Sequence, residues 1–280
     1  MVFSVNLFIE ILRSSSRKLL NAWGDLRRLF IIISGKYLGH QGSKKKDLME
    51  LKDKKILVVA AHPDDEVLGC GGTLAKAIAE GSEVHVIFLG EGISARFPIG
   101  EYGSKEFHEQ TKVRQEGAKK ALAVLKITNF EFGTRLCTQF DKYPLLSIVK
   151  EIEMKLESFS PDILFTHNPA EVNIDHRLTY EAVEVACRPT RKNIPKEIYT
   201  FEILCSGSWT FESTFKPNVF VNIAKFWDIK LKAWQCYEGE ARPFPFPRCE
   251  EGMKTVAQYR GLSSNLELAE GFKLVRKICL

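Results

Sequence analysis

The chain of 280 residues has no pair of cysteines in Cys-x-x-Cys spacing, and its seven cysteines are scattered from Cys70 to Cys279. Disulfide frameworks belong mainly to small secreted domains, so this usage predicts reduced thiols and a cytoplasmic protein. None of the cysteines stands beside a histidine in the sequence. A nucleophilic cysteine therefore has no support from the sequence.

Long hydrophobic runs are also missing. No stretch approaches the roughly 18 uncharged apolar residues that identify a membrane-spanning helix. Residues 1–12 are apolar but lack the cationic start of a signal peptide, and no suitable cleavage site follows them. We therefore expect neither a spanning helix nor a secretory signal.

Most of the chain has no excess of charge. Residues 1–50 hold nine Lys/Arg and four Asp/Glu, which is the whole net charge of +5, and residues 51–280 hold 31 of each sign. Residues 51–280 therefore lack the excess of positive charge that is typical of a nucleic-acid-binding domain. The length and a hydrophobic content of 45% predict one domain at residues 51–280 and an extension at residues 1–50.

The extension has the pattern of a basic amphipathic helix followed by a linker. Its apolar side chains recur at helical spacing, and basic residues are available to the other faces: Leu19, Trp23, Leu26, Phe30 and Ile33 against Arg17, Lys18, Arg27 and Arg28. Such a helix fits two placements. Either residues 1–40 form a peripheral contact with the inner face of a membrane, or the helix packs on the domain or on a second subunit of a homo-oligomer.

From Lys54 onward, apolar strands alternate with helices. Strands are predicted at 55–60, 83–89, 129–132, 162–166, 197–203 and 218–221, and helices at 70–80, 105–125, 145–158, 177–187, 223–238 and 250–260. Strands that alternate with helices of ten or more residues indicate βαβ units. The sequence thus predicts an α/β fold, a Rossmann-like three-layer sandwich with a mostly parallel sheet, preceded by the basic amphipathic N-terminal helical extension.

The most informative segment is residues 61–66, Ala-His-Pro-Asp-Asp-Glu, which follows the apolar strand at 55–60. Sites in open α/β sheets lie at the carboxyl ends of the strands. His62 and Asp65 are three positions apart in a turn fixed by Pro63, so both can point at one ion. Imidazole and carboxylate ligands suit zinc, which needs a third protein ligand.

A second cluster of polar residues follows the apolar strand at 162–166. Of the six histidines, His85 lies inside a predicted strand, and His40 and His108 lie in the extension and in a polar stretch. We therefore predict that His176 is the third ligand of a single Zn²⁺ ion. Asp175 or another carboxylate is predicted to orient a ligand without binding the metal itself.

Residues 54–278 resemble the LmbE/PIG-L-type zinc-dependent N-acetylglucosamine deacetylases. The resemblance rests on four short segments: residues 61–66, Asp-His at 175–176, the helix segment 113–118 around Arg114, and Ala-Glu-Gly-Phe at 269–272. It implies that His62, Asp65 and His176 are the zinc ligands. It also implies that Asp64 is the general base and that Arg114 contacts the substrate.

The chain departs from that family's pattern at two positions. Asn173 stands where many members have a histidine that helps to protonate the reaction, and it can offer the substrate a hydrogen bond but no proton. Either His167 substitutes at the substrate, or Asp64 serves first as base and then as acid. In the turn at 245–248, Phe246 stands where relatives often have a histidine.

The predicted function is removal of the N-acetyl group from an N-acetylated amino sugar, with the basic helix favouring a lipid- or nucleotide-linked one. The alternatives are a zinc hydrolase of another amide or ester and a non-catalytic metal-binding protein. Asp64 argues against the last, because a structural zinc site needs four ligands and no base. The glycines at 69, 71 and 72 lack dinucleotide-binding spacing, and a two-metal phosphoesterase needs more bridging carboxylates.

If the extension is a membrane anchor, deleting residues 1–50 should abolish binding to anionic vesicles and leave turnover of a soluble N-acetylated substrate unchanged. Vesicle binding by the full chain should weaken with salt, because each basic residue near the surface contributes about 1 kcal/mol of screened attraction. Co-sedimentation measures the binding. Aggregation or metal loss in the truncated protein would instead make the helix a packing element of the fold.

Overall fold

The computed structural model describes residues 49–190, 192–212 and 214–279. The predicted extension, apart from its last two residues, lies outside the described residues, as do its amphipathic helix and the predicted membrane contact. In the described part of the chain, no helix is long and apolar enough to span a membrane.

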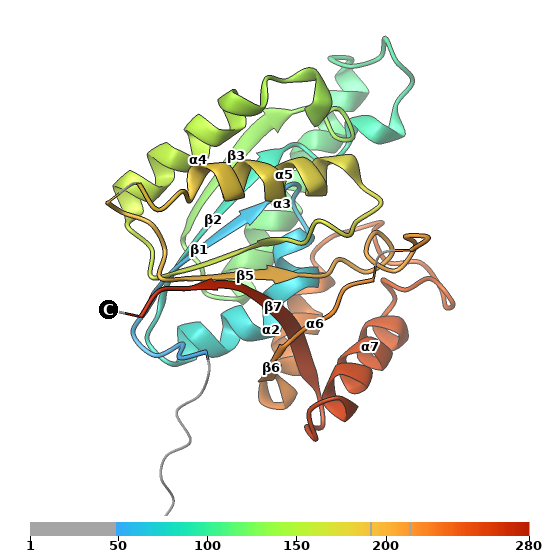
Figure 1. Cartoon of the computed structure of the whole chain (residues 1–280). Helices are drawn as coiled ribbons and strands as arrows, with labels where there is room; N and C mark the ends of the chain where they lie inside the picture. The colour runs from blue at the N-terminus through green and yellow to red at the C-terminus, as the bar shows by residue number, and fades with distance from the viewer. Residues whose placement is uncertain (1–48, 191, 213, 280) are drawn as a thin grey trace, which may run out of the picture. The chain divides into compact units, whose positions relative to one another are not determined.

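A mixed sheet of seven strands forms the centre of the fold, in the order β3-β2-β1-β4-β5-β7-β6 (Figure 1). Five strands run parallel to one another: β1 (Lys55–Ala60), β2 (Glu83–Gly90), β3 (Asn129–Arg135), β4 (Ile163–His167) and β5 (Glu197–Phe201). β7 (Ala269–Lys277) pairs antiparallel with β5 and with β6 (Val219–Asn222). The predicted α/β fold with a mostly parallel sheet is confirmed.

Two hydrophobic cores cover the two faces of this sheet. Along β1, Ile56 and Val58 enter one core, and Leu57 and Val59 enter the other, since successive strand residues point to opposite faces. The first core contains side chains of α2 (Asp65–Ala79), α3 (Lys105–Val124), α6 (Trp227–Trp234) and α7 (Glu250–Leu262). The second contains side chains of α4 (Leu145–Phe159) and α5 (Ile174–Ala186), which Figure 1 shows together on one side of the sheet.

The order of the strands reverses between β1 and β4. From β1 the chain continues through β2 and β3 on one side, whereas β4 and β5 lie on the other. Open α/β sheets bind their ligands outside the carboxyl ends of the strands at such a reversal. The loops that follow β1 and β4 carry both predicted motifs, so the topology brings these motifs together.

Helix α2 begins at Asp65, five residues earlier than predicted, and packs very close to the sheet. A Cβ atom at Gly69 would lie 2.5 Å from the ring of Phe201, and one at Gly72 would lie 2.8 Å from Ile223. These glycines therefore serve the approach of α2 to its neighbours. This packing requirement explains a glycine-rich segment that lacks the spacing of a phosphate-binding loop.

Two predictions near the C-terminus differ from the structure. The helix expected at 223–238 is shorter, because α6 covers only Trp227–Trp234 after a single 3₁₀ turn. No strand was predicted at β7. Its first four residues are buried, but Lys273, Val275 and Lys277 are exposed, so the strand combines a buried run with a half-exposed end. Neither the continuous apolar run of a fully buried strand nor the alternation of a half-buried strand extends over all of β7, which is why its sequence did not predict a strand.

Candidate active site

The three predicted metal ligands lie together at the carboxyl ends of β1 and β4. One donor atom from each of His62, Asp65 and His176 lies within 4.8 Å of the other two, and all three side chains are buried. Nε2 of His176 is 3.5 Å from Oδ1 of Asp65, and Nδ1 of His62 is 3.7 Å from Oδ2. Folding therefore forms the cluster that the sequence predicted.

Each histidine of this cluster is oriented by a second carboxylate. Nε2 of His62 lies 2.8 Å from Oδ2 of Asp175, and Nδ1 of His176 lies 2.9 Å from Oε2 of Glu171. If each of these nitrogens carries the ring proton and donates a hydrogen bond to the carboxylate, the other ring nitrogen keeps a free lone pair that faces Asp65. Asp175 has the predicted orienting position. Glu171 was missed, because a carboxylate in a loop carries no sequence signal for this contact.

The donor set fits a divalent cation such as zinc. Oδ2 of Asp65 accepts the backbone N–H of His62 at 2.8 Å, but Oδ1 is buried and has no hydrogen-bond partner among the described residues. Burial raises the pKa of Asp65, yet the facing His176 and His167 outweigh burial and hold this pKa well below its usual value. A buried, ionised carboxylate with one unpartnered oxygen beside two imidazoles is a ligand set that zinc prefers.

The two histidines of this set have opposite pKa shifts. Burial lowers the pKa of His176 to about 4, so this ring is neutral at pH 7, as a metal ligand must be. Burial also opposes the charged form of His62, but Cys137 and Asp175 outweigh it and raise its pKa well above the usual value. Cation binding at His62 would therefore release a proton.

Asp64 faces two arginines. Its Oδ2 accepts hydrogen bonds from Nη2 of Arg114 at 2.9 Å and from Nη1 of Arg248 at 3.2 Å. Its backbone has a φ of 120°, a strained value for a residue with a side chain, which separates its direction from that of Asp65. Burial raises the pKa of Asp64 to about 6 against the opposing effect of the arginines. At neutral pH this carboxylate is ionised but still has appreciable affinity for a proton.

The backbone of Asp64 is held by a third acidic residue. The N–H of Asp64 donates to Oε2 of Glu66 at 3.0 Å, and the Tyr237 hydroxyl donates to Oε1 of the same carboxyl. Burial raises the pKa of Glu66 to about 8, so it is protonated at neutral pH and adds no charge beside Asp64 and Asp65. The three adjacent carboxyls therefore differ in pKa: that of Asp65 is well below its usual value, that of Asp64 is about 6 and that of Glu66 is about 8.

Arg114, the predicted substrate contact, is buried and pairs with both Asp64 and Glu240. Its guanidinium carbon lies 5.5 Å from the centre of the Tyr237 ring. The residue also lines a pocket of about 180 Å³, which further includes Arg96, Gln110, Val113, Tyr237 and Glu240. Arg114 thus binds the predicted base, Asp64, and also lines this cavity.

The other two predicted substrate residues have structural contacts. His167 is fully buried, its ring stacks on His176 with centroids 4.0 Å apart, and its Nε2 lies 3.0 Å from the backbone nitrogen of Ala61. Asn173 is the N-cap of α5, where its Oδ1 accepts the N–H of Asp175 at 2.9 Å. His167 has no exposed surface to offer a substrate, and Asn173 fixes the start of the helix that carries His176.

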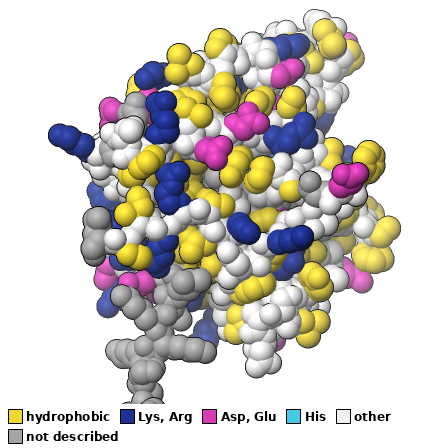
Figure 2. Space-filling view, viewed as in Figure 1, with side chains coloured by type: hydrophobic (Ala, Val, Ile, Leu, Met, Phe, Trp, Pro, Cys, Tyr) yellow, Lys and Arg dark blue, Asp and Glu magenta, His cyan; other side chains and the backbone are white. Residues whose placement is uncertain are grey.

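The face of the molecule drawn in Figure 2 has mixed character. In the view of Figure 2, basic, acidic and hydrophobic side chains are interspersed, and no histidine is visible, in keeping with the burial of His62, His167 and His176. The ligands lie beneath the surface at the ends of the strands. Access to them depends on the surrounding loops.

The fold is an open α/β sheet whose switch point carries a buried cluster of His and Asp side chains that can hold a metal ion, with a further aspartate beside it. Comparison with known proteins identifies the family. Residues 57–187 match the model described as PIG-L: GlcNAc-PI de-N-acetylase. The diacetylchitobiose deacetylase of Thermococcus kodakarensis is 30% identical over 237 residues, which cover 81% of this chain and 85% of that protein. The chain therefore belongs to the PIG-L family.

Two further relatives show the breadth of this similarity. The solved structure of N,N'-diacetylchitobiose deacetylase from Pyrococcus horikoshii aligns with a TM-score of 0.64 at 24% identity, over 79% of this chain and 84% of that one, and supports the fold. The 4-oxalmesaconate hydratase of Pseudomonas putida is 24% identical over 255 residues, covering 84% of this chain and 95% of that protein. Relatives of this chain thus include proteins named for two different reactions.

Glu171→Gln should weaken metal binding by about 10- to 100-fold, since a lost outer carboxylate costs a metal site that much affinity. The amide oxygen of Gln can still accept a hydrogen bond from Nδ1 of His176, but it lacks the negative charge of the ionised carboxylate, which Glu171 carries above a pKa that burial raises to about 7. Chelator competition with zinc measures the change. Glu181→Gln, at an exposed position of α5, is the control and should bind as the wild type does. Equal affinity in the two variants would remove Glu171 from the metal site.

Proposed function

We propose that this chain is a zinc-dependent deacetylase of N-acetylated amino sugars. The observation that carries the proposal is the ionisable Asp64 beside a buried ligand cluster in which Oδ1 of Asp65 has no partner among the described residues. Membership of the PIG-L family and the name of the Thermococcus kodakarensis relative support the same reaction class. His62, Asp65 and His176 would hold the ion.

The proton transfers can be assigned to one residue. Zinc, when bound at such a site, lowers the pKa of a coordinated water and polarises the acyl carbonyl. Asp64 accepts a proton from the attacking water and returns it to the amine nitrogen that leaves. A pKa of about 6 suits both steps, because the ideal acid–base catalyst has a pKa near the working pH. This shuttle requires no proton from the buried His167 or from the amide of Asn173.

The arginines around Asp64 keep that carboxylate in place. Arg114 and Arg248 both bind Oδ2, which leaves Oδ1 to exchange the proton. Arg114 also lines the pocket of about 180 Å³, whose polar side chains suit sugar hydroxyls and whose Tyr237 ring suits the apolar face of a sugar ring. We infer that part of the sugar binds there, with Arg114 as its contact.

A hydratase is the second candidate, because the Pseudomonas putida relative is named for that reaction. Both reactions activate water, but they differ in what the water attacks. A deacetylase adds water to an amide carbonyl and releases acetate and an amine. A hydratase adds water across a carbon–carbon double bond and releases nothing. The products therefore separate the two candidates.

Incubation of the zinc-loaded protein with a panel of N-acetylated sugars should release acetate and a primary amine in equal amounts. The panel should include free, nucleotide-linked and lipid-linked N-acetylglucosamine and N-acetylated disaccharides. Removal of the metal with a chelator should stop the release, and zinc should restore it. Hydration of an unsaturated acid without acetate release from any sugar would favour the hydratase.

Asp64→Asn should keep the metal and lose activity by a factor of about 10² or more, as expected when a general base is removed. Asparagine retains the shape of the side chain but takes up no proton. Metal content and kcat are both measured, with Asp228→Asn at an exposed position of α6 as the control. Loss of zinc together with activity would mean that Asp64 is a ligand and that the two aspartates have been assigned the wrong way round.

A further inference from the structure

Helix α2 is interrupted near its start. At Cys70 the backbone φ is −146° and ψ is 15°, which are not helical values. Asp65 and Glu66 belong to the short segment before this break. A break in a helix leaves carbonyl groups before it and N–H groups after it without intrahelical partners. Because these residues of α2 are buried, those groups need partners from other elements.

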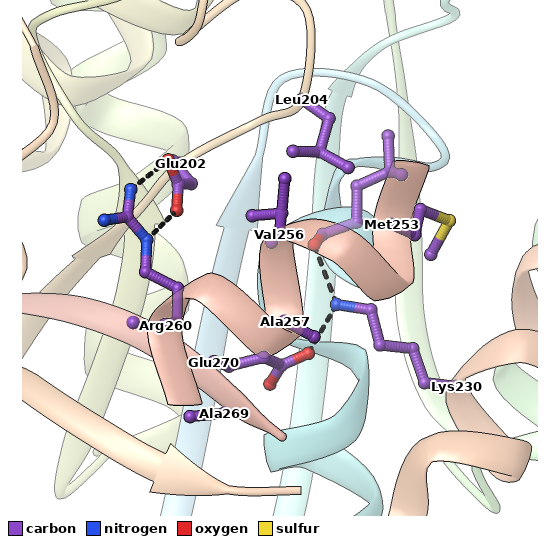
Figure 3. A pocket seen from close by; sticks show the side chains of 12 residues that line it. Glu202, Leu204, Lys230, Met253, Val256, Ala257, Arg260, Ala269 and Glu270 are labelled. Atoms are coloured by element: carbon purple, nitrogen blue, oxygen red, sulfur yellow. Dashed lines mark hydrogen bonds and ion pairs between the residues drawn. The ribbon is translucent and has the colours of Figure 1, made fainter. Parts of the chain in front are cut away.

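Lys230 and Glu270 supply these partners, and Figure 3 shows the ion pair between their side chains. The ammonium of Lys230, on α6, donates to the carbonyl oxygen of Leu68 at 3.0 Å. The carboxylate of Glu270, on β7, accepts the backbone N–H groups of Gly72 and Thr73 at 2.9 and 2.7 Å. Nζ of Lys230 also lies 2.6 Å from Oε1 of Glu270. The ion pair therefore bridges the two segments of α2.

This pair is buried on both sides, with Lys230 and Glu270 each only 6% exposed. Removing two charges from water is costly, and a buried ion pair is often no more stabilising than apolar side chains of similar size. Stability alone is therefore a weak explanation for the pair. Its three hydrogen bonds to backbone groups around the break give it a geometric role that apolar side chains cannot fill.

We propose that Lys230 and Glu270 are positioning residues for the candidate metal centre. The segment before the break is about one and a half turns long and follows directly on Asp64. The ion pair fixes this segment against the rest of α2, and so fixes the direction of Asp65 toward His176 and of Asp64 toward its arginines. The proposal rests on the proposed function, which supplies the metal affinity and the turnover that the pair controls.

A second ion pair, which lies near the first, offers a matched control. Arg260, on α7, binds Glu202 through Nε and Nη2, both at 2.7 Å (Figure 3). Both pairs line one small cavity with a volume of about 30 Å³. In the described part of the chain, the Arg260–Glu202 pair makes no hydrogen bond to α2. Its loss should affect stability without moving the start of that helix.

The test compares Lys230→Met, Glu270→Gln and Glu202→Gln with the wild type. Zinc affinity is measured by chelator competition, and kcat and KM are measured with the best substrate of the panel, well below each variant's melting temperature. Lys230→Met and Glu270→Gln should weaken zinc binding about tenfold, the lower end for residues that support a ligand, and should lower kcat about tenfold with little change in KM. Glu202→Gln should change only the melting temperature.

Lys230→Arg retains a positive charge and several N–H donors, so it should recover most of the zinc affinity and kcat lost in Lys230→Met. If Glu270→Gln does not fold, the comparison of Met with Arg at position 230 decides the question. Variants that melt earlier but bind zinc and turn over as Glu202→Gln does would overturn the positioning role. A wild-type protein that binds no zinc and releases no acetate would overturn the proposed function first, and this inference with it.

Discussion

The burial of the Asp65 carboxylate among histidines is the constraint on which the site depends. A buried charge is unfavourable unless hydrogen bonds or opposite charges compensate it. At Asp65 the compensation is incomplete in one place, because Oδ1 has no partner among the described residues, while Nε2 of His176 lies 3.5 Å away. A cation completes such a site, since it supplies the missing interaction to the carboxylate and to both rings. The carboxylates of Asp175 and Glu171 orient the two rings of that centre, and each also accepts a backbone N–H from a neighbouring loop.

Adjacent residues of one type take opposite roles because their surroundings differ. Asp65 is surrounded by imidazoles, and its pKa lies well below the usual range, whereas burial raises the pKa of Asp64 to about 6 although two arginines bind it. When the pKa values of two neighbouring acids are shifted apart in this way, one stays ionised while the other can exchange protons. The strained φ of Asp64 permits the separation, because it sends consecutive side chains to different partners.

The sequence predicted those parts of the molecule that depend on local patterns. Buried strands such as β1 and β4 are continuous apolar runs, and the polar residues directly after them, among them His62 and His176, could be placed at the sheet edge by topology. Contacts between distant segments have no such signature. Arg248 reaches Asp64 across 184 positions, and Glu270 reaches Gly72 across 198. These partners are single charged residues in stretches whose local pattern would equally suit a solvated surface.

The site is therefore built from two parts of the chain, one inside the segment that matches the family model and one after it. The candidate ligands and Asp64 lie within residues 57–187, the part that matches the family model. Asp64 is held from both parts: Arg114 and Glu66 contact it from within that range, whereas Arg248 binds its carboxylate from outside. Tyr237 and Glu240, also outside, bind Glu66 and Arg114 in turn. A metal cluster of the same composition could thus operate with a base of different pKa and a differently shaped pocket, if only these later segments changed.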